Sequence, residues 1–113
     1  MSDWLDLLEL EKMLRALADE ARLNIVHHLA GQGEVTVTEI CLSLNISQPL
    51  VSWHLRSLRR ADIVRTRRFG RQVYCSLDLP RFQRCQQWLA SLVATGNTPD
   101  AAHLDLRGER VQS

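Results

Sequence analysis

Hydrophobic residues recur at helical spacing in five segments of the chain, and this spacing predicts five α-helices. The segments are residues 4–17, 20–30, 37–44, 48–60 and 80–95. The first segment is apolar around more of its circumference than one buried face needs, which indicates that it packs against two partners. Asp19 is placed as the N-cap of the second helix, and Gly31 and Gly33 end that helix.

A tight turn joins the third and fourth helices. Thr36 and Glu39 have the T-x-x-E spacing of a capping box, which predicts the start of the third helix. Asn45 tolerates a left-handed backbone conformation and is expected to end it. Ser47 is the expected N-cap of the fourth helix, and Pro49 fits its first turn, where a missing N–H costs nothing. Two helices across a short turn predict a helix-turn-helix.

The hydrophobic period changes to two after Asp62. Residues 63–77 alternate around Gly70, which predicts a β-hairpin with arginines at its tip, and Pro80 then opens the last helix. Residues 97–113 are polar and without periodicity, so we expect a flexible C-terminal tail. The predicted fold is mainly α, in the α+β class: a winged helix-turn-helix of four helices, a hairpin and a fifth helix, in one domain of residues 1–96.

Composition excludes several classes of protein. With 113 residues, 45% of them hydrophobic, the chain fits one globular domain. It has no apolar run near the ~20 residues of a membrane span, and its acidic start is unlike a signal peptide, so we expect a cytoplasmic protein without a membrane partner. No nucleophile elbow, phosphate loop or H-E-x-x-H motif is present, so we expect no enzyme and no cofactor.

The charges are segregated along the chain. Residues 1–39 hold eight acidic and three basic residues, whereas residues 56–71 hold seven arginines and one aspartate. A basic cluster on a helix and a hairpin favours double-stranded DNA as the partner. The polar face of the fourth helix is predicted to enter the major groove, and the hairpin to contact the DNA beside it. The predicted contacts are Gln48, Pro49, Ser52, Trp53, Arg56, Arg59 and Arg60 on the helix, and Arg65, Arg67, Arg68 and Arg71 on the hairpin.

Two aromatic side chains of the fourth helix have alternative interpretations. An exposed indole is costly unless it contacts something, so Trp53 is predicted to pack on a thymine methyl or the DNA backbone; the alternative is that it turns inward against the hairpin. His54 borders the inward face, where a structural hydrogen bond is favoured over base contact or metal binding.

Residues 17–23 (LADEARL) and 46–64 (ISQPLVSWHLRSLRRADIV) resemble the ArsR/SmtB family of winged-helix repressors. The resemblance implies a homodimer formed by the first and last helices, which binds a pseudo-palindromic operator. It places the family's base contacts on Gln48, Pro49, Ser52 and Trp53. A winged-helix module that binds protein remains an alternative.

Metal and thiol chemistry are the effector classes that the resemblance raises. The family's metal-ligand positions fall here on Thr36, Thr38, Leu79, Arg81, Leu92 and Thr95. These residues are poor metal ligands, so no metal site is expected. A thiol-based redox-sensing repressor is a further alternative that rests on Cys41, Cys75 and Cys85, although packing explains each cysteine better. Cys85 is expected in the dimer stripe of the last helix.

Overall fold

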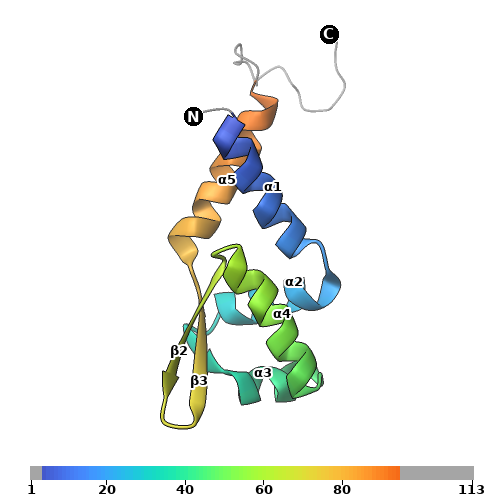
Figure 1. Ribbon diagram of the computed structural model, residues 1–113, viewed down its shortest axis with the longest axis vertical. Helices are drawn as coiled ribbons and strands as arrows, with labels where there is room; N and C mark the ends of the chain where they lie inside the picture. The colour runs from blue at the N-terminus through green and yellow to red at the C-terminus, as the bar shows by residue number, and fades with distance from the viewer. Residues whose placement is uncertain (1–3, 95–113) are drawn as a thin grey trace.

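The computed structural model describes residues 4–94, with side chains from residue 7 onward. Across this range five helices and a three-stranded antiparallel sheet form a winged helix-turn-helix (Figure 1). The elements, in order, are α1 (Trp4–Leu17), α2 (Glu20–Ala30), β1 (Glu34–Thr36), α3 (Val37–Leu44), α4 (Gln48–Arg60), β2 (Val64–Phe69), β3 (Gln72–Leu77) and α5 (Leu79–Val93). The predicted order is confirmed, and the tail predicted for residues 97–113 lies outside the described residues.

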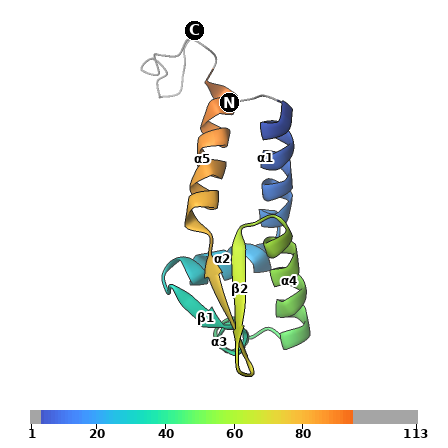
Figure 2. The ribbon, with the colours of Figure 1, turned by 60° about the vertical axis from the view of Figure 1, so that its left-hand side comes forward.

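Helices α1 and α5 lie side by side and extend beyond the rest of the fold (Figures 1 and 2). Glu9 of α1 forms an ion pair with Arg81 of α5, which joins the two helices. Cys85 and Trp88 are buried in the core of the protomer. The side of α5 that carries Cys85 therefore packs inside the same chain, and the expectation that Cys85 belongs to the dimer stripe stays a prediction.

The core fills the space between the helices and the inner face of the sheet. Its fully buried side chains come from α1, α2, α3, α4 and β3, and from the segment that leads into β2. Burying an aliphatic side chain of this size contributes about 1.5–3 kcal/mol to the stability of the folded chain. These residues therefore supply most of the favourable free energy of folding. They include Met13, Ile25, Leu29, Ile40, Val51, Leu58, Ile63 and Cys75.

Short-range capping begins and ends the helices as the sequence predicts. The Asp19 carboxylate accepts a hydrogen bond from the Arg22 backbone N–H at 3.1 Å. Thr36 and Glu39 form a reciprocal capping box, with the two bonds at 3.1 and 2.8 Å. Asn45 ends α3 in the left-handed conformation, with φ 56° and ψ 50°. The capping box and Asn45 thus fix the two ends of α3, the helix that precedes the turn.

Two caps differ from expectation. Ser47 occupies the N-cap position of α4, but its side chain makes no capping hydrogen bond. Helix α5 begins at Leu79, and the Asp78 carboxylate, which was not predicted as a cap, accepts from the Arg81 backbone N–H at 3.2 Å. Helix α5 therefore starts one residue before the predicted Pro80.

The sheet has the strand order β1-β3-β2. Strands β2 and β3, with the turn between them, form the wing, and Gly70 in that turn has a positive φ of 64°. Strand β1 was not predicted, because three residues are too few to show an alternating pattern. It pairs Val35 with the buried Cys75 of β3 and so ties the wing to the helices.

Candidate nucleic-acid interface

Helix α4 presents its polar face to solvent because of the turn before it. After Asn45, the Ile46 N–H donates to the Cys41 carbonyl at 3.2 Å, which closes the end of α3. Val51, Leu55 and Leu58 are then buried. The predicted contact residues of this helix are all exposed: Gln48, Pro49, Ser52, Trp53, Arg56, Arg59 and Arg60. Their exposure agrees with the sequence analysis, while DNA contact by each stays a prediction.

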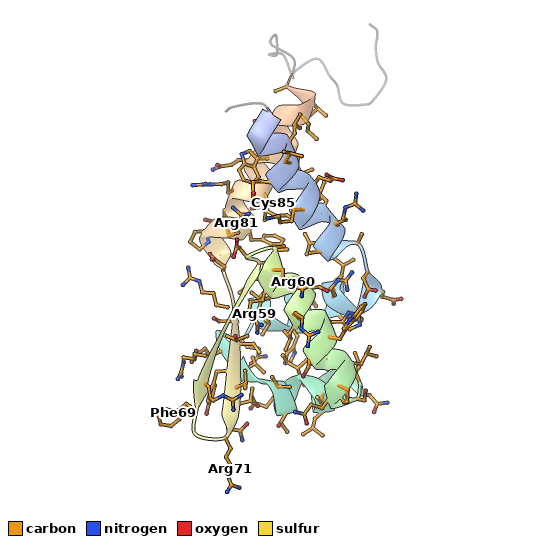
Figure 3. All side chains as sticks on the ribbon, viewed as in Figure 1. Arg59, Arg60, Phe69, Arg71, Arg81 and Cys85 are labelled. Atoms are coloured by element: carbon orange, nitrogen blue, oxygen red, sulfur yellow. The ribbon has the colours of Figure 1, made fainter. Side chains whose placement is uncertain are left out.

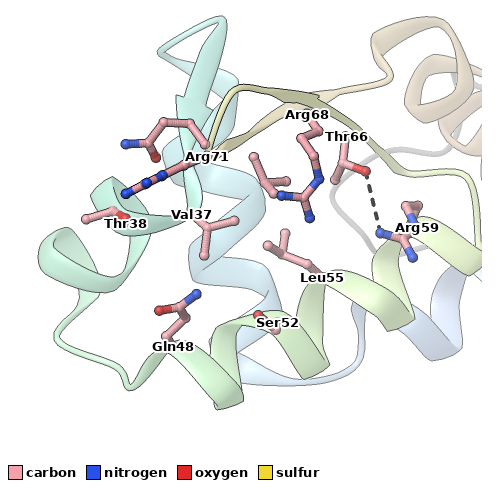
Figure 4. Close-up of a pocket in the computed structure, with 11 residues that line it drawn as sticks. Val37, Thr38, Gln48, Ser52, Leu55, Arg59, Thr66, Arg68 and Arg71 are labelled. Atoms are coloured by element: carbon pink, nitrogen blue, oxygen red, sulfur yellow. Dashed lines mark hydrogen bonds between the residues drawn. The ribbon is translucent and has the colours of Figure 1, made fainter.

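A groove of about 280 Å³ separates α4 from the wing, and we call it the recognition groove (Figure 4). The Arg59 guanidinium donates to the Thr66 hydroxyl at 3.5 Å across it. Among residues 7–94, its three arginines form no ion pair with an acid, so they leave it strongly cationic. The lining residues are Val37, Thr38, Gln48, Ser52, Leu55, Arg59, Thr66, Arg68, Arg71, Gln72 and Val73.

The other two predicted wing arginines lie on the opposite face of the sheet. Arg65 donates to Asp78 at 3.1 Å, and Arg67 binds both carboxylate oxygens of Glu34 at 2.7 and 2.8 Å. The Arg67 guanidinium also stacks over the Tyr74 ring, 4.7 Å from its centroid. The hydrogen bonds from Arg67 lower the pKa of Glu34, and those to Glu34 raise the pKa of Arg67. The structure therefore divides the predicted wing cluster between two faces.

Trp53 lies on the flank of α4 that is turned toward α2. Its ring is 52% exposed, and the Arg22 guanidinium lies 5.8 Å from its centroid. The alternative that Trp53 turns inward against the wing is therefore wrong. The neighbouring His54 is buried, with its Nδ1 atom 3.1 Å from Nη1 of Arg22. The predicted structural hydrogen bond of His54 is confirmed.

Phe69 at the wing tip is a candidate contact that the sequence analysis missed. Its side chain is 69% exposed beside the Gly70 turn, and Figure 3 shows it and Arg71 projecting from the tip. Apolar side chains at such positions insert between base steps or pack in the minor groove. The sequence did hold a signal for this exposure: in a strand, Phe69 lies on the same face as Arg65 and Arg67, which is not the core face.

The burial of Cys75 and Cys85 supports a packing role for these cysteines. Burial raises the pKa of the Cys75 thiol to about 11 and also raises the pKa of the Cys85 thiol. Because the thiolate is the reactive form, these two cysteines are poor redox sensors; Cys41 is half-buried. In the described part of the chain, no three His, Cys, Asp or Glu side chains gather as metal ligands, and no helix has the length and apolar character of a membrane span.

Comparison with known proteins gives consistent results. Residues 19–66 match the family model of the bacterial regulatory proteins of the arsR family. The chain is 36% identical over 104 residues to the arsenic resistance transcriptional regulator ArsR1 of Pseudomonas putida, covering 89% of this chain and 81% of that protein. It is 30% identical over 88 residues to the transcriptional repressor SdpR of Bacillus subtilis, covering 78% and 97%. Reduced HlyU from Vibrio cholerae superimposes with a TM-score of 0.62 at 30% identity, covering 78% of this chain and 92% of that structure.

Proposed function

Because this chain belongs to the arsR family of bacterial regulatory proteins, and is thus a DNA-binding transcriptional regulator and not an enzyme, we propose that it is a repressor. In this proposal the protein binds an inverted-repeat operator as a homodimer. Helix α4 lies in the major groove, and the wing contacts the backbone beside it.

The observation that carries this proposal is the recognition groove. Gln48 and Ser52 supply hydrogen-bonding groups for base edges on the same side of α4 as three arginines without acidic partners. Arg59, Arg68 and Arg71 are suited to phosphate contacts, which supply affinity without sequence information. Arg56, Pro49 and Trp53 are exposed at the flank of this face, where contacts depend on how α4 sits in the groove.

The homodimer is supported by apolar side chains that α1 and α5 leave exposed. Leu7, Leu8 and Leu14 are 38–45% exposed on α1, and Leu89 and Leu92 are 40% and 53% exposed on α5. Large apolar patches on soluble chains mark interaction sites, and most homo-oligomers are two-fold symmetric. A two-fold axis beside these helices places two α4 helices against half-sites about one helical turn, ~34 Å, apart.

We further propose that the family's metal-ligand positions do not bind a metal in this chain. The Thr36 hydroxyl accepts the Glu39 N–H in the capping box, and Arg81 is paired with Glu9. Neither a hydroxyl nor a guanidinium is a ligand for soft metal ions. The arsenic named for the relative in Pseudomonas putida is therefore no guide to the effector of this protein.

The test is selection of bound fragments from sheared genomic DNA of the source organism, followed by fluorescence anisotropy on the enriched site. We expect a shared inverted repeat, with affinity that falls steeply between about 50 and 200 mM salt. Arg59→Gln is expected to weaken binding, while Arg84→Gln, on the exposed surface of α5, is the matched control that keeps it. Failure to enrich any sequence with a reduced, dimeric preparation would instead support the protein-interaction module.

A further inference from the structure

A second hollow, of about 480 Å³, lies between the C-terminal halves of α1 and α4, on the flank of α4 turned away from the wing. We call it the α1–α4 hollow. Four cationic side chains from three different helices line it, and no carboxylate does. Figure 3 shows Arg60 at the end of α4 that faces α1. The lining residues are Lys12, Arg15, Ala16, Arg22, Ser57, Arg60 and Ala61.

The positive charge of this hollow is only partly compensated. Lys12 and Arg15 pair with Glu9 and Glu11 along α1, at 3.8 and 2.5 Å. Exposed pairs of this kind contribute little to stability, so these side chains can exchange their carboxylate for a stronger partner. Arg60 makes no ion pair with any acid among residues 7–94.

Arg22 joins the hollow to the recognition helix. Its Nε donates to the Ala16 carbonyl at 2.6 Å, and its Nη1 lies 3.1 Å from Nδ1 of the buried His54. A guanidinium has five N–H donors, so most of the donors of Arg22 remain for a further acceptor. The tendency of cations to sit at the C-terminal end of a helix accounts for Arg15 and Arg60, which lie in the last turns of α1 and α4. It does not account for Lys12, which precedes the last turn of α1, or for Arg22 in the first turn of α2.

We propose that the α1–α4 hollow binds a small multivalent anion with phosphate or carboxylate groups, and that Arg22 and His54 couple this binding to α4. Clustered cations in a concave surface raise the local concentration of such anions, and arginine forks bind their oxygens bidentately. The anion binds the remaining donors of Arg22, whose Nη1 contacts His54, and so shifts the guanidinium relative to His54; it also adds negative charge beside α4. Both effects weaken operator binding, so this second part of the proposal rests on the proposed function.

The binding part is tested without DNA, by calorimetric titration of the full chain with sodium pyrophosphate at constant ionic strength. We expect saturable binding at millimolar or lower concentration. Lys12→Gln and Arg60→Gln are each expected to weaken it about fivefold or more, and Arg84→Gln to leave it unchanged. No binding up to about 10 mM, or equal binding by all variants, overturns the proposal. Circular dichroism confirms that each variant is folded.

The coupling part is tested by operator titrations with and without pyrophosphate at matched ionic strength. We expect several-fold weaker operator binding with the anion, and a smaller response in Lys12→Gln, whose operator affinity without anion is unchanged. An unchanged affinity of the wild-type protein with the anion bound overturns the coupling. If Arg60→Gln lowers the salt dependence of operator binding but not the pyrophosphate affinity, DNA phosphate is the occupant, and the proposal fails. Because the first titration needs no DNA, its failure is distinct from failure to find an operator.

Discussion

Neighbouring arginines of the wing are expected to behave differently in operator binding, because they point to opposite faces of β2. Arg68 lines the recognition groove, whereas Arg67 binds Glu34 through two hydrogen bonds and stacks over Tyr74 on the other face. Substitution of either residue by glutamine removes one positive charge from the same strand. Arg68→Gln removes a phosphate contact in our proposal, and Arg67→Gln removes an internal brace of the sheet.

The salt dependence of binding separates these two roles. Each lost phosphate contact reduces the slope of log affinity against log salt by about 0.9. Over a fourfold rise in salt, from about 50 to 200 mM, the affinity of Arg68→Gln should therefore fall about 3.5-fold less than that of the wild-type protein. Arg67→Gln should keep the wild-type slope, whatever it does to the affinity at one salt concentration.

Fluorescence anisotropy on a labelled operator, at four or more salt concentrations, measures these slopes. Glu34→Gln serves as the third variant, because it releases Arg67 without changing the number of arginines. Its slope should equal or exceed that of the wild-type protein. If Arg67→Gln lowers the slope as much as Arg68→Gln does, Arg67 contacts DNA, and the interpretation of the two faces is wrong.

Three further predictions concern stability, reactivity and assembly. His54→Ala should lower the free energy of unfolding by about 1–3 kcal/mol in urea denaturation, since Arg22 loses its partner inside the fold. Cys75 should resist Ellman's reagent in the folded protein. Its pKa is about 11 in the folded chain and about 9 ordinarily, so the thiol of the unfolded chain ionises first as the pH rises. The free energy of unfolding should therefore fall between these two pH values. Leu14→Glu should shift the protein from dimer to monomer in sedimentation velocity and weaken operator binding with it.

Each of these has a matched control. His27→Ala changes an exposed histidine of α2 and should alter stability by less than about 0.5 kcal/mol; an equal loss in both variants contradicts the role of His54. Rapid labelling of Cys75 before unfolding contradicts its burial. Leu42→Glu introduces the same charge at an exposed leucine of α3 and should leave the dimer intact, whereas a Leu14→Glu dimer contradicts the proposed interface.

The sequence predicted the elements that short-range chemistry determines. The capping box of Thr36 and Glu39 and the left-handed Asn45 depend on atoms three or four residues apart, so their signals are present in the local pattern. The polar face of α4 was likewise predictable, because helical periodicity alone separates Val51 and Leu55 from the exposed positions. The helix-turn-helix could be predicted from sequence because it consists of these local elements.

Contacts between residues distant in sequence were not predictable in the same way. Cys85 has helical spacing with the exposed Leu89, and periodicity cannot tell which side of α5 packs against α1 and which faces solvent. Trp53 could be placed on the exposed side of α4, but its contact with Arg22 requires knowledge of how α2 crosses α4. Strand β1 becomes a strand only because β3 offers it an edge.

The distribution of charged residues along the sequence differs from their distribution on the folded surface. Acids from the first 39 residues return to the arginines of the second half: Glu34 binds Arg67, and Glu9 binds Arg81. The alternation of β2 directs Arg67 toward Glu34 and Arg65 toward Asp78, while Arg68 stays on the side of α4. Folding thus concentrates the uncompensated charge of the wing in the recognition groove. A protein with the same arginine count but without these acids would bind DNA with a steeper salt dependence and less control of wing orientation.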